Sequence, residues 1–237
     1  QVDGGERRRG QVIDVGAVAG VQAGGGRLTA EYFSAAPGSK VGKRFHPDTR
    51  ADLKVLDDAC DAGARHMTHF MNAMAPLHHR TPGPIAWGLS RDDVTVDVIA
   101  DGIHLDPFML RLLLKLKGAQ GISLISDAIA AAGKGDGDYD IWGETISVKN
   151  GRTANAAGSI AGSVISMVDA VRLLHSLGVS YVDLARMASS NPARLLGIDG
   201  ECGSIEAGKR ADLVALDEDA NVKFTLIGGR SVILHQS

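Results

Sequence analysis

Histidine and aspartate side chains recur where apolar runs of this sequence end. Three of them lie in or just after runs that we predict to be strands, namely His69 in 67–71, His104 after 94–100 and Asp127 after 122–126. Imidazole and carboxylate groups bind divalent metals and transfer protons near neutral pH. One ionisable residue at a strand end is unremarkable, but three in succession indicate a site built from strand ends.

The densest of these stretches, 65–83, holds four of the eight histidines of the chain. It begins as a short strand, Met67–Met71, and then becomes a loop rich in proline and histidine. A histidine late in a strand and followed by a polar loop is where barrel enzymes place a metal ligand. We therefore expect a metal or substrate role for His69, and we expect the other three, His66, His78 and His79, to be mostly solvated loop residues.

The elements that must position these side chains alternate between strand and helix. A helix is predicted at 48–63 and another at 107–117, where Pro107 occupies the first turn. With the predicted strands, this alternation is typical of a parallel sheet or barrel. The carboxyl ends of parallel strands form one rim, so His69, His104 and Asp127 are expected to converge there.

The segments after Asp127 change character. A Gly-rich loop at 128–137 precedes two short strands within 139–153, and the Gly/Ser loop 158–163 precedes a helix at 164–177. Backbone N–H groups of that loop could bind an anion or sugar oxygens, although Ser163 alone is equally well explained as a helix N-cap. Two further helices follow, over 181–188 and from Asn191 to about Gly197, and then a small sheet with strands at 211–216, 222–227 and 231–234.

Composition excludes several classes of protein. The chain has 237 residues, 44% hydrophobic content and a formal net charge of −3, so no basic excess is available to neutralise nucleic-acid phosphates. No run of 18 apolar residues is present, so no membrane span is expected. Cys60 and Cys202 lie outside any metal-ligand spacing, which is typical of reduced thiols in a cytoplasmic protein.

Six blocks of the sequence together resemble one known family. In chain order they read THFMNAMAPLHHRTPG, IADGIHLDP, ISDAIAAAG, AGSVISM, MASSNPARLLGI and GSIEAGKRADLVALD. They resemble the N-acetylglucosamine-6-phosphate deacetylases of the amidohydrolase superfamily, over about 61–230. The resemblance implies a (β/α)8 barrel with a small β-sandwich. It also implies metal-dependent hydrolysis of the N-acetyl group of N-acetylglucosamine 6-phosphate, an amino-sugar phosphate, to glucosamine 6-phosphate and acetate.

The resemblance also implies roles for individual residues. His69 is similar to a metal ligand and Asp127 to the catalytic acid/base, and one or two divalent ions, zinc or iron, would be bound. Arg80 resembles an arginine that reaches the substrate phosphate across a homodimer interface. The other substrate contacts carried over by motif are Asn72, Ala73, His104, Ile160, Ala161 and Gly162.

Other motifs of the family are absent. Neither its HxH motif nor its metal-binding glutamate motif is found, and the counterpart of its fifth-strand histidine is His46, in RFHPDTRAD. His46 is expected either to ligate the metal or to be an exposed loop histidine. We expect residues 1–45 to be unassigned, 46–200 to form an incomplete barrel of four βα units, and 201–237 to form a small β subdomain.

Two other functions stay open at this point. Four parallel strands cannot close a barrel, so the chain could be a catalytically incomplete fragment that binds ligand or self-associates through its open sheet. Within the enzyme class, N-acetylgalactosamine 6-phosphate is the alternative substrate, because the two sugars differ at one hydroxyl.

Overall fold

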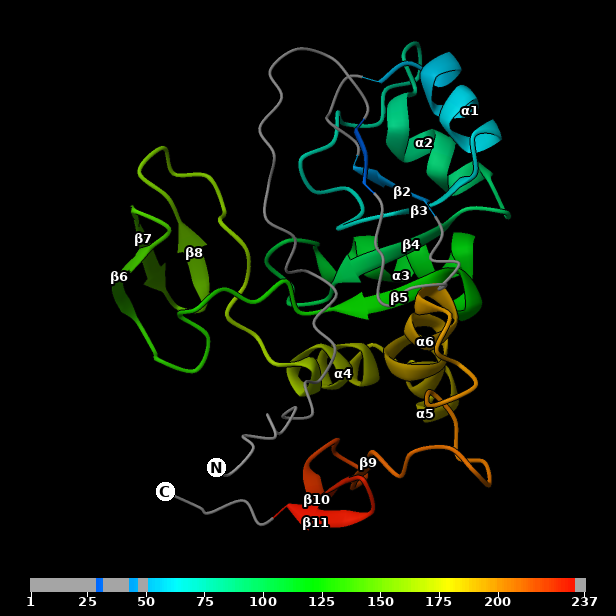
Figure 1. The fold of residues 1–237 in the computed structure, drawn as a ribbon. Coiled ribbons are helices and arrows are strands. Elements are labelled where there is room, and N and C mark those ends of the chain that lie inside the picture. Colours follow the sequence, from blue (N-terminus) through cyan, green and yellow to red (C-terminus); the bar gives the residue numbers. More distant parts are fainter. Residues whose placement is uncertain (1–28, 32–42, 47–50, 233–237) are drawn as a thin grey trace, which may run out of the picture.

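A five-stranded sheet forms the centre of the molecule, with helices packed against it and two small antiparallel sheets at its periphery (Figure 1). The computed structural model describes residues 29–31, 43–46 and 51–232 of the chain. A short strand is also possible from the sequence at 11–15, a range that lies outside the described residues.

The central sheet has the order β1-β2-β3-β4-β5. Its strands are β1 (Thr29–Glu31), β2 (Lys43–His46), β3 (Ala64–Met67), β4 (Thr95–Ile99) and β5 (Ile122–Ile125). β1 pairs antiparallel with β2, whereas β2, β3, β4 and β5 are mutually parallel. The predicted parallel arrangement is therefore present in these four strands, and their carboxyl ends lie along one edge of the sheet.

The two faces of this sheet differ in polarity. Successive side chains of a strand point to opposite faces, and in β4 the alternate residues Val96 and Val98 belong to the main hydrophobic core. Asp97, between them, faces the other way and is only 1% exposed. His66 of β3 shares that polar face, because its ring contacts Asp97 directly. The sheet thus buries apolar side chains under the helices and polar side chains on its opposite face.

Six α-helices belong to the described residues. They are α1 (Leu53–Asp61), α2 (Gly83–Ser90), α3 (Pro107–Lys117), α4 (Met167–Ser176), α5 (Tyr181–Ala185) and α6 (Asn191–Leu196). A π-helical turn at 186–190 joins α5 to α6, and a short 3₁₀ turn at 119–121 precedes β5. None of the helices in the described part of the chain is long and apolar enough to cross a membrane.

The bounds predicted for helix α3, 107–117, are confirmed. The residues at its two ends show how the local sequence sets these bounds. The side chain of Asp106 accepts a hydrogen bond from the Phe108 N–H, and Pro107 occupies the first turn. Gly118, at φ 66°, ends the helix. Its inner face buries Leu110 and Leu113, each worth about 1.5–3 kcal/mol relative to exposure.

Two sequence predictions around the first histidine stretch are wrong. The strand expected at 67–71 is β3, which ends at Met67, and the chain then turns with positive φ at His69, Met71 and Ala73. His66 was expected to be solvated, but it is 1% exposed because it lies within β3 and pairs with β4. His78 and His79 are exposed, as expected.

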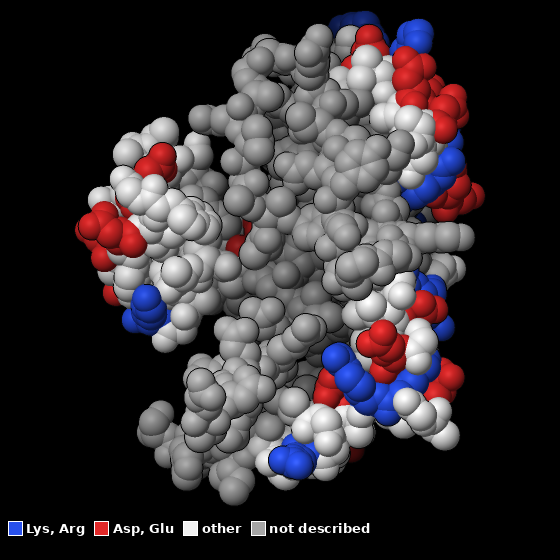
Figure 2. Space-filling view, viewed as in Figure 1, with Lys and Arg blue, Asp and Glu red and all other residues white. Residues whose placement is uncertain are grey.

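Two antiparallel sheets of three strands complete the fold. The first consists of β6 (Gly137–Ile141), β7 (Glu144–Lys149) and β8 (Arg152–Ala154), where two strands were predicted. The second consists of β9 (Leu213–Leu216), β10 (Val222–Ile227) and β11 (Arg230–Val232), close to the predicted tail strands. On the face seen in Figure 2, the β6–β8 sheet presents more acidic than basic side chains, whereas the helical side presents both signs.

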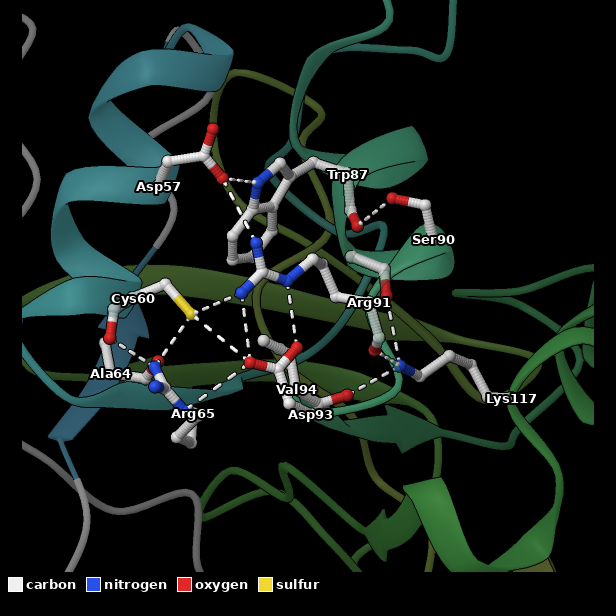
Figure 3. A network of polar contacts seen from close by, with 11 residues as sticks. Asp57, Cys60, Ala64, Arg65, Trp87, Ser90, Arg91, Asp93, Val94 and Lys117 are labelled. Carbon is white, nitrogen blue, oxygen red and sulfur yellow. Dashed lines mark hydrogen bonds and ion pairs between the residues drawn. The ribbon is translucent and has the colours of Figure 1, made fainter.

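A polar network lies at the amino-terminal ends of β3 and β4 (Figure 3). Arg91 donates to the carboxylate of Asp93 at 2.9 Å and to the sulfur of Cys60 at 3.1 Å. Burial raises the pKa of the Cys60 thiol despite the nearby guanidinium groups of Arg65 and Arg91. The thiol is therefore kept protonated and unreactive. Guanidinium, carboxylate and thiol groups of this network are thus paired with one another at this edge of the sheet.

Candidate active site

The side chains predicted to be functional lie beyond the carboxyl ends of neighbouring strands. His69 follows β3, His104 follows β4 and Asp127 follows β5. These three strands pair in parallel, so their ends lie side by side at one edge. That edge is opposite to the network around Arg91, which lies at the amino-terminal ends of the strands.

His69 occupies a strained turn directly after β3. Its φ of 34° is uncommon for a residue with a side chain. The ring Nδ1 atom lies 3.2 Å from the carbonyl oxygen of Asn72, so Nδ1–H donates to that oxygen. In the neutral ring this hydrogen bond leaves the lone pair on Nε2, which is the tautomer that a metal-ligating histidine needs.

His46 is the last residue of β2, the strand next to β3. Its backbone therefore reaches the same edge as His69, and its side chain lies outside the described structure. Imidazole nitrogen is a suitable ligand for zinc or iron. No group of three or more His, Cys, Asp or Glu side chains that could hold a metal occurs among the described residues. The donor type fits a divalent metal, and the described residues supply only part of a ligand set.

His104 forms a buried pair with Asp101. The ring Nδ1 atom lies 2.7 Å from Asp101 Oδ2, and the two side chains are 6% and 2% exposed. The other carboxylate oxygen accepts the N–H groups of Ile103 and His104, each at 2.8 Å. Burial acts to raise the pKa of Asp101, but these hydrogen bonds outweigh it and hold the pKa below its usual range. The ionised carboxylate fixes the orientation of the His104 ring.

Asp127 lies against the Gly/Ser loop that precedes α4. It has φ 48°, and its carbonyl oxygen accepts the Ser163 N–H at 2.8 Å. The Ser163 hydroxyl in turn donates to the carbonyl of Ser126. Ser163 is 1% exposed and ties the loop to the end of β5. The helix N-cap role that the sequence also allows for Ser163 is wrong, because the N-cap of α4 is Ser166.

The loop residues Ile160, Ala161 and Gly162 are held in place by Thr153 of β8. The Thr153 hydroxyl accepts the Ala161 N–H at 3.0 Å and donates to the Gly162 carbonyl at 2.6 Å. Gly162 has φ 68°, and a Cβ there would lie 2.9 Å from the Asp127 carbonyl oxygen. The loop thus lies next to the Asp127 backbone.

Three further predicted residues lie between β3 and α2. Asn72 and Ala73 belong to the turn after His69, and the Asn72 side chain donates to the Phe70 carbonyl at 3.4 Å. Arg80 is exposed, and its guanidinium forms no ion pair with another described residue. The described structure brings Asn72 close to His69.

Sequence reasoning missed two carboxylates at this edge. Asp101 has a local signal, because it precedes His104 by three residues, within reach of the same turn. Asp97 has a weaker signal, a charged residue inside the apolar run of β4, which must find a partner when buried. Its partners, His66 and the backbone of His69, lie about thirty residues earlier and cannot be found from spacing.

The parallel α/β sheet, with histidine and carboxylate groups at its strand ends, is the arrangement of a hydrolase of the amidohydrolase type. The chain belongs to the amidohydrolase family, whose model matches residues 45–232. Members of this family are generally dependent on divalent metals.

Curated relatives that the chain matches include amino-sugar phosphate deacetylases. It is 42% identical over 183 residues to the N-acetylglucosamine-6-phosphate deacetylase of Bacillus subtilis (strain 168), covering 76% of this chain and 46% of the relative. It is 42% identical over 173 residues to the N-acetylgalactosamine-6-phosphate deacetylase of Escherichia coli O157:H7, covering 73% of this chain and 46% of the relative. The chain thus spans about half the length of both relatives.

Solved structures give the same result. A variant of the N-acetyl-D-glucosamine-6-phosphate deacetylase of Mycobacterium smegmatis, in complex with N-acetyl-D-glucosamine 6-phosphate, superposes with a TM-score of 0.73 at 37% identity. The match covers 79% of this chain and 50% of that chain. The family resemblance predicted from the six sequence blocks is confirmed.

Proposed function

We propose that this chain carries the catalytic carboxylate and part of the metal and substrate site of an N-acetylglucosamine-6-phosphate deacetylase. The reaction is hydrolysis of the N-acetyl group to give glucosamine 6-phosphate and acetate. The observation that carries the proposal is the alignment of His69, the His104–Asp101 pair and Asp127 along one edge of a parallel sheet. The 42% identity to a deacetylase of this substrate supports it.

Asp127 acts as the proton-transfer group. A divalent metal, zinc or iron, with His69 and His46 among its ligands, would lower the pKa of a bound water and polarise the acetyl carbonyl. Asp127 accepts a proton from the water as the water oxygen adds to the acetyl carbon. Asp127 then donates that proton to the sugar nitrogen as the C–N bond breaks, so acetate and the free amine leave.

His104 orients the substrate in this proposal. Because Asp101 holds Nδ1–H, the opposite nitrogen of the ring is presented in a fixed direction. Asn72, Ala73 and the loop 160–162 contact the sugar through amide and backbone groups. This division of roles separates proton transfer by Asp127 from substrate binding by its neighbours.

Arg80 binds the substrate phosphate, and it does so from a second copy of the chain. A planar guanidinium suits a phosphate dianion. Its exposure, without an ion pair to any other described residue, is compatible with a site across a homodimer interface. We place the protein in the cytoplasm, where phosphorylated sugars are metabolised.

The architecture proposed for the active protein is a (β/α)8 barrel with a small β-sandwich. In this chain residues 46–200 are the part of the barrel that contains the last residue of β2 and all of β3, β4 and β5, residues 201–237 belong to the small β subdomain, and 1–45 stay unassigned. The remaining barrel strands would correspond to the half of the relatives' length that this chain does not match. Closing the sheet in this way would also protect its open edges.

One observation favours a second candidate, a chain that binds ligand without turnover. The described residues gather no group of three metal-binding side chains. The alternative substrate is N-acetylgalactosamine 6-phosphate, since a relative of equal identity is named for it.

The test is to measure the metal content of the purified chain and its turnover of the two epimeric sugar phosphates. The proposal predicts bound zinc or iron, and higher kcat/KM for the gluco substrate. His69→Ala should lose both metal and turnover, whereas Asp127→Asn should lose turnover alone. A folded chain that binds the sugar phosphate but releases no acetate at any metal concentration supports the non-catalytic candidate instead.

A further inference from the structure

Asp97 is a buried carboxylate on the polar face of the central sheet. It lies in the middle of β4, is 1% exposed, and pairs through its backbone with Ser123 of β5. A buried charge is costly unless hydrogen bonds surround it. The groups that donate hydrogen bonds to Asp97 therefore indicate its structural role.

Donors from β3 and from the turn after it surround the carboxylate. His66 Nε2 lies 2.9 Å from Oδ2, and the Thr68 hydroxyl lies 3.3 Å from the same oxygen. The N–H group of His69 donates to Oδ1. The carboxylate thus connects His66 within β3 to His69 in the turn.

The backbone of Asp97 holds the next residue of that turn. Its carbonyl oxygen accepts the Phe70 N–H at 2.9 Å. One residue of β4 therefore binds two successive N–H groups, those of His69 and Phe70, one through its side chain and one through its main chain. The side chain and the main chain of Asp97 thus hold adjacent positions of the turn.

The turn held in this way is strained. His69 has φ 34°, and Met71 and Ala73 also have positive φ. A non-glycine residue in such a conformation is strained and persists only where the surroundings hold it. Hydrogen bonds to a charged acceptor are strong enough to do so.

We propose that Asp97 is the positioning residue of His69. Its carboxylate holds the His69 backbone in the positive-φ turn, so that the imidazole stands at the end of β3 instead of continuing the strand. His66, locked between Thr95 at 2.8 Å and Asp97, fixes the carboxylate in turn. The backbone part of this inference is independent of the proposed deacetylase activity, while its consequence for metal binding rests on that activity.

The first test uses nuclear magnetic resonance on the metal-free, full chain labelled with ¹⁵N and ¹³C. In the wild-type protein we expect a downfield His69 amide proton, slow exchange of that proton with solvent, and scalar coupling through the hydrogen bond to the Asp97 carboxyl carbon. A His69 amide without that coupling and with unprotected exchange overturns the proposal without any variant.

Two substitutions of Asp97 distinguish the effect of its hydrogen bonds from the effect of its side-chain volume. Asp97→Asn keeps an acceptor oxygen, whereas Asp97→Leu has similar volume and no acceptor. We expect His69 amide exchange to be about 10- to 100-fold faster in Asp97→Leu, with most of the protection kept in Asp97→Asn. Ser123→Ala, on the same face one strand away, is the matched control and should leave the His69 amide unchanged. If Asp97→Leu does not fold, the wild-type coupling and the Asp97→Asn exchange rate still decide the question.

The second test measures the affinity of the same proteins for zinc. We expect Asp97→Leu to bind zinc roughly 10- to 100-fold more weakly, as is typical when a group supporting a ligand is lost. Asp97→Asn and Ser123→Ala should bind like the wild type. Unchanged His69 exchange in folded Asp97→Leu overturns the proposal. A wild-type chain that binds no zinc contradicts the proposed metal site, while the amide measurements still decide whether Asp97 positions His69.

Discussion

The Nδ1 atom of His104 lies 2.7 Å from Oδ2 of Asp101, three residues earlier, and both side chains are almost completely buried. The pair lies beyond the end of β4, between the strand ends that present His69 and Asp127. A histidine held by an ionised carboxylate keeps one orientation and one tautomer. The pair is thus a fixed element of the site rather than a surface ion pair.

If the pair acts as a unit, its two residues should not contribute independently. We predict that Asp101→Asn lowers kcat/KM about 10- to 100-fold, because a charge-assisted hydrogen bond is lost. The double variant with His104→Asn should be no worse than His104→Asn alone. Steady-state kinetics on the four proteins measures this, and strictly multiplicative losses would contradict the coupling.

Replacing Asp127 should separate turnover from binding. Asp127→Asn keeps the shape of the side chain and tolerates φ 48°, where alanine would be strained. We predict a loss of roughly 100- to 10,000-fold in kcat with little change in substrate affinity. Asp106→Asn, at the N-cap of α3, is the control, because Asn caps a helix as well as Asp does. Equal losses of kcat in the two variants would contradict a catalytic role for Asp127.

Gly162 should be intolerant of a side chain for two separable reasons. Its φ is positive, and a Cβ would also lie 2.7 Å from the Ile129 side chain and 2.9 Å from the Asp127 carbonyl. Gly158 shares the positive φ but has nothing within 4 Å. We predict that Gly158→Ala costs about 1 kcal/mol of stability and that Gly162→Ala costs clearly more and lowers turnover. Urea unfolding and kinetics compare the two variants, and similar behaviour would show that the steric contact is unimportant.

Lys117 should contribute to stability and not to catalysis. Its ammonium group donates to the carbonyls of Gly88, Arg91 and Val94 at 3.1, 2.6 and 2.5 Å, at the amino-terminal edge of the sheet (Figure 3). We predict that Lys117→Met lowers the free energy of unfolding by about 1–3 kcal/mol, because three carbonyls lose their donor. Turnover per folded molecule should not change. Lys115→Met, on the exposed side of α3, should have little effect on either quantity.

Acid should weaken the network around Arg91. A hydrogen bond from Arg91 is the main reason that the pKa of Asp93 falls to about 2. A carboxyl group with a lowered folded-state pKa stabilises the fold above its unfolded pKa of about 3.9, and this contribution is lost as the pH falls toward 2. We predict that the stability difference between wild type and Asp93→Asn is constant above pH 5 and shrinks below pH 4. Urea unfolding at several pH values measures it, with Asp92→Asn as the control for removing an exposed charge. A stability difference between wild type and Asp93→Asn that grows as the pH falls would contradict the prediction.

The sequence predicts those parts of the fold whose signals are local. The bounds of α3 follow from Asp106, Pro107 and Gly118, and β4 and β5 follow from short apolar runs. Helix α2 falls in a segment to which no element was assigned, because its Gly- and Pro-rich start is typical of a loop. The strand predicted at 67–71 fails since contacts with Asp97, 28 residues from His69, override the local preference.

The candidate site likewise has residues that the sequence predicts and contacts that only the fold reveals. His69, His104 and Asp127 are recognised from strand-end position and motif, whereas the contacts that Asp97 makes with His66 and His69 are recognised only from the fold. His66 shows the limit most clearly, because its burial depends on a partner 31 residues away. Local sequence identifies groups that can do chemistry, and tertiary contacts decide how they are held.

The measurement that tests the central claim most directly is acetate release from N-acetylglucosamine 6-phosphate by the purified chain. The assay is run with added zinc or iron, with a chelator, and with Asp127→Asn as the matched inactive variant. We predict chelator-sensitive release of acetate and glucosamine 6-phosphate in equal amounts, and none from the variant. Folded, metal-supplied wild-type protein that releases no acetate, or release that Asp127→Asn does not reduce, would contradict the account.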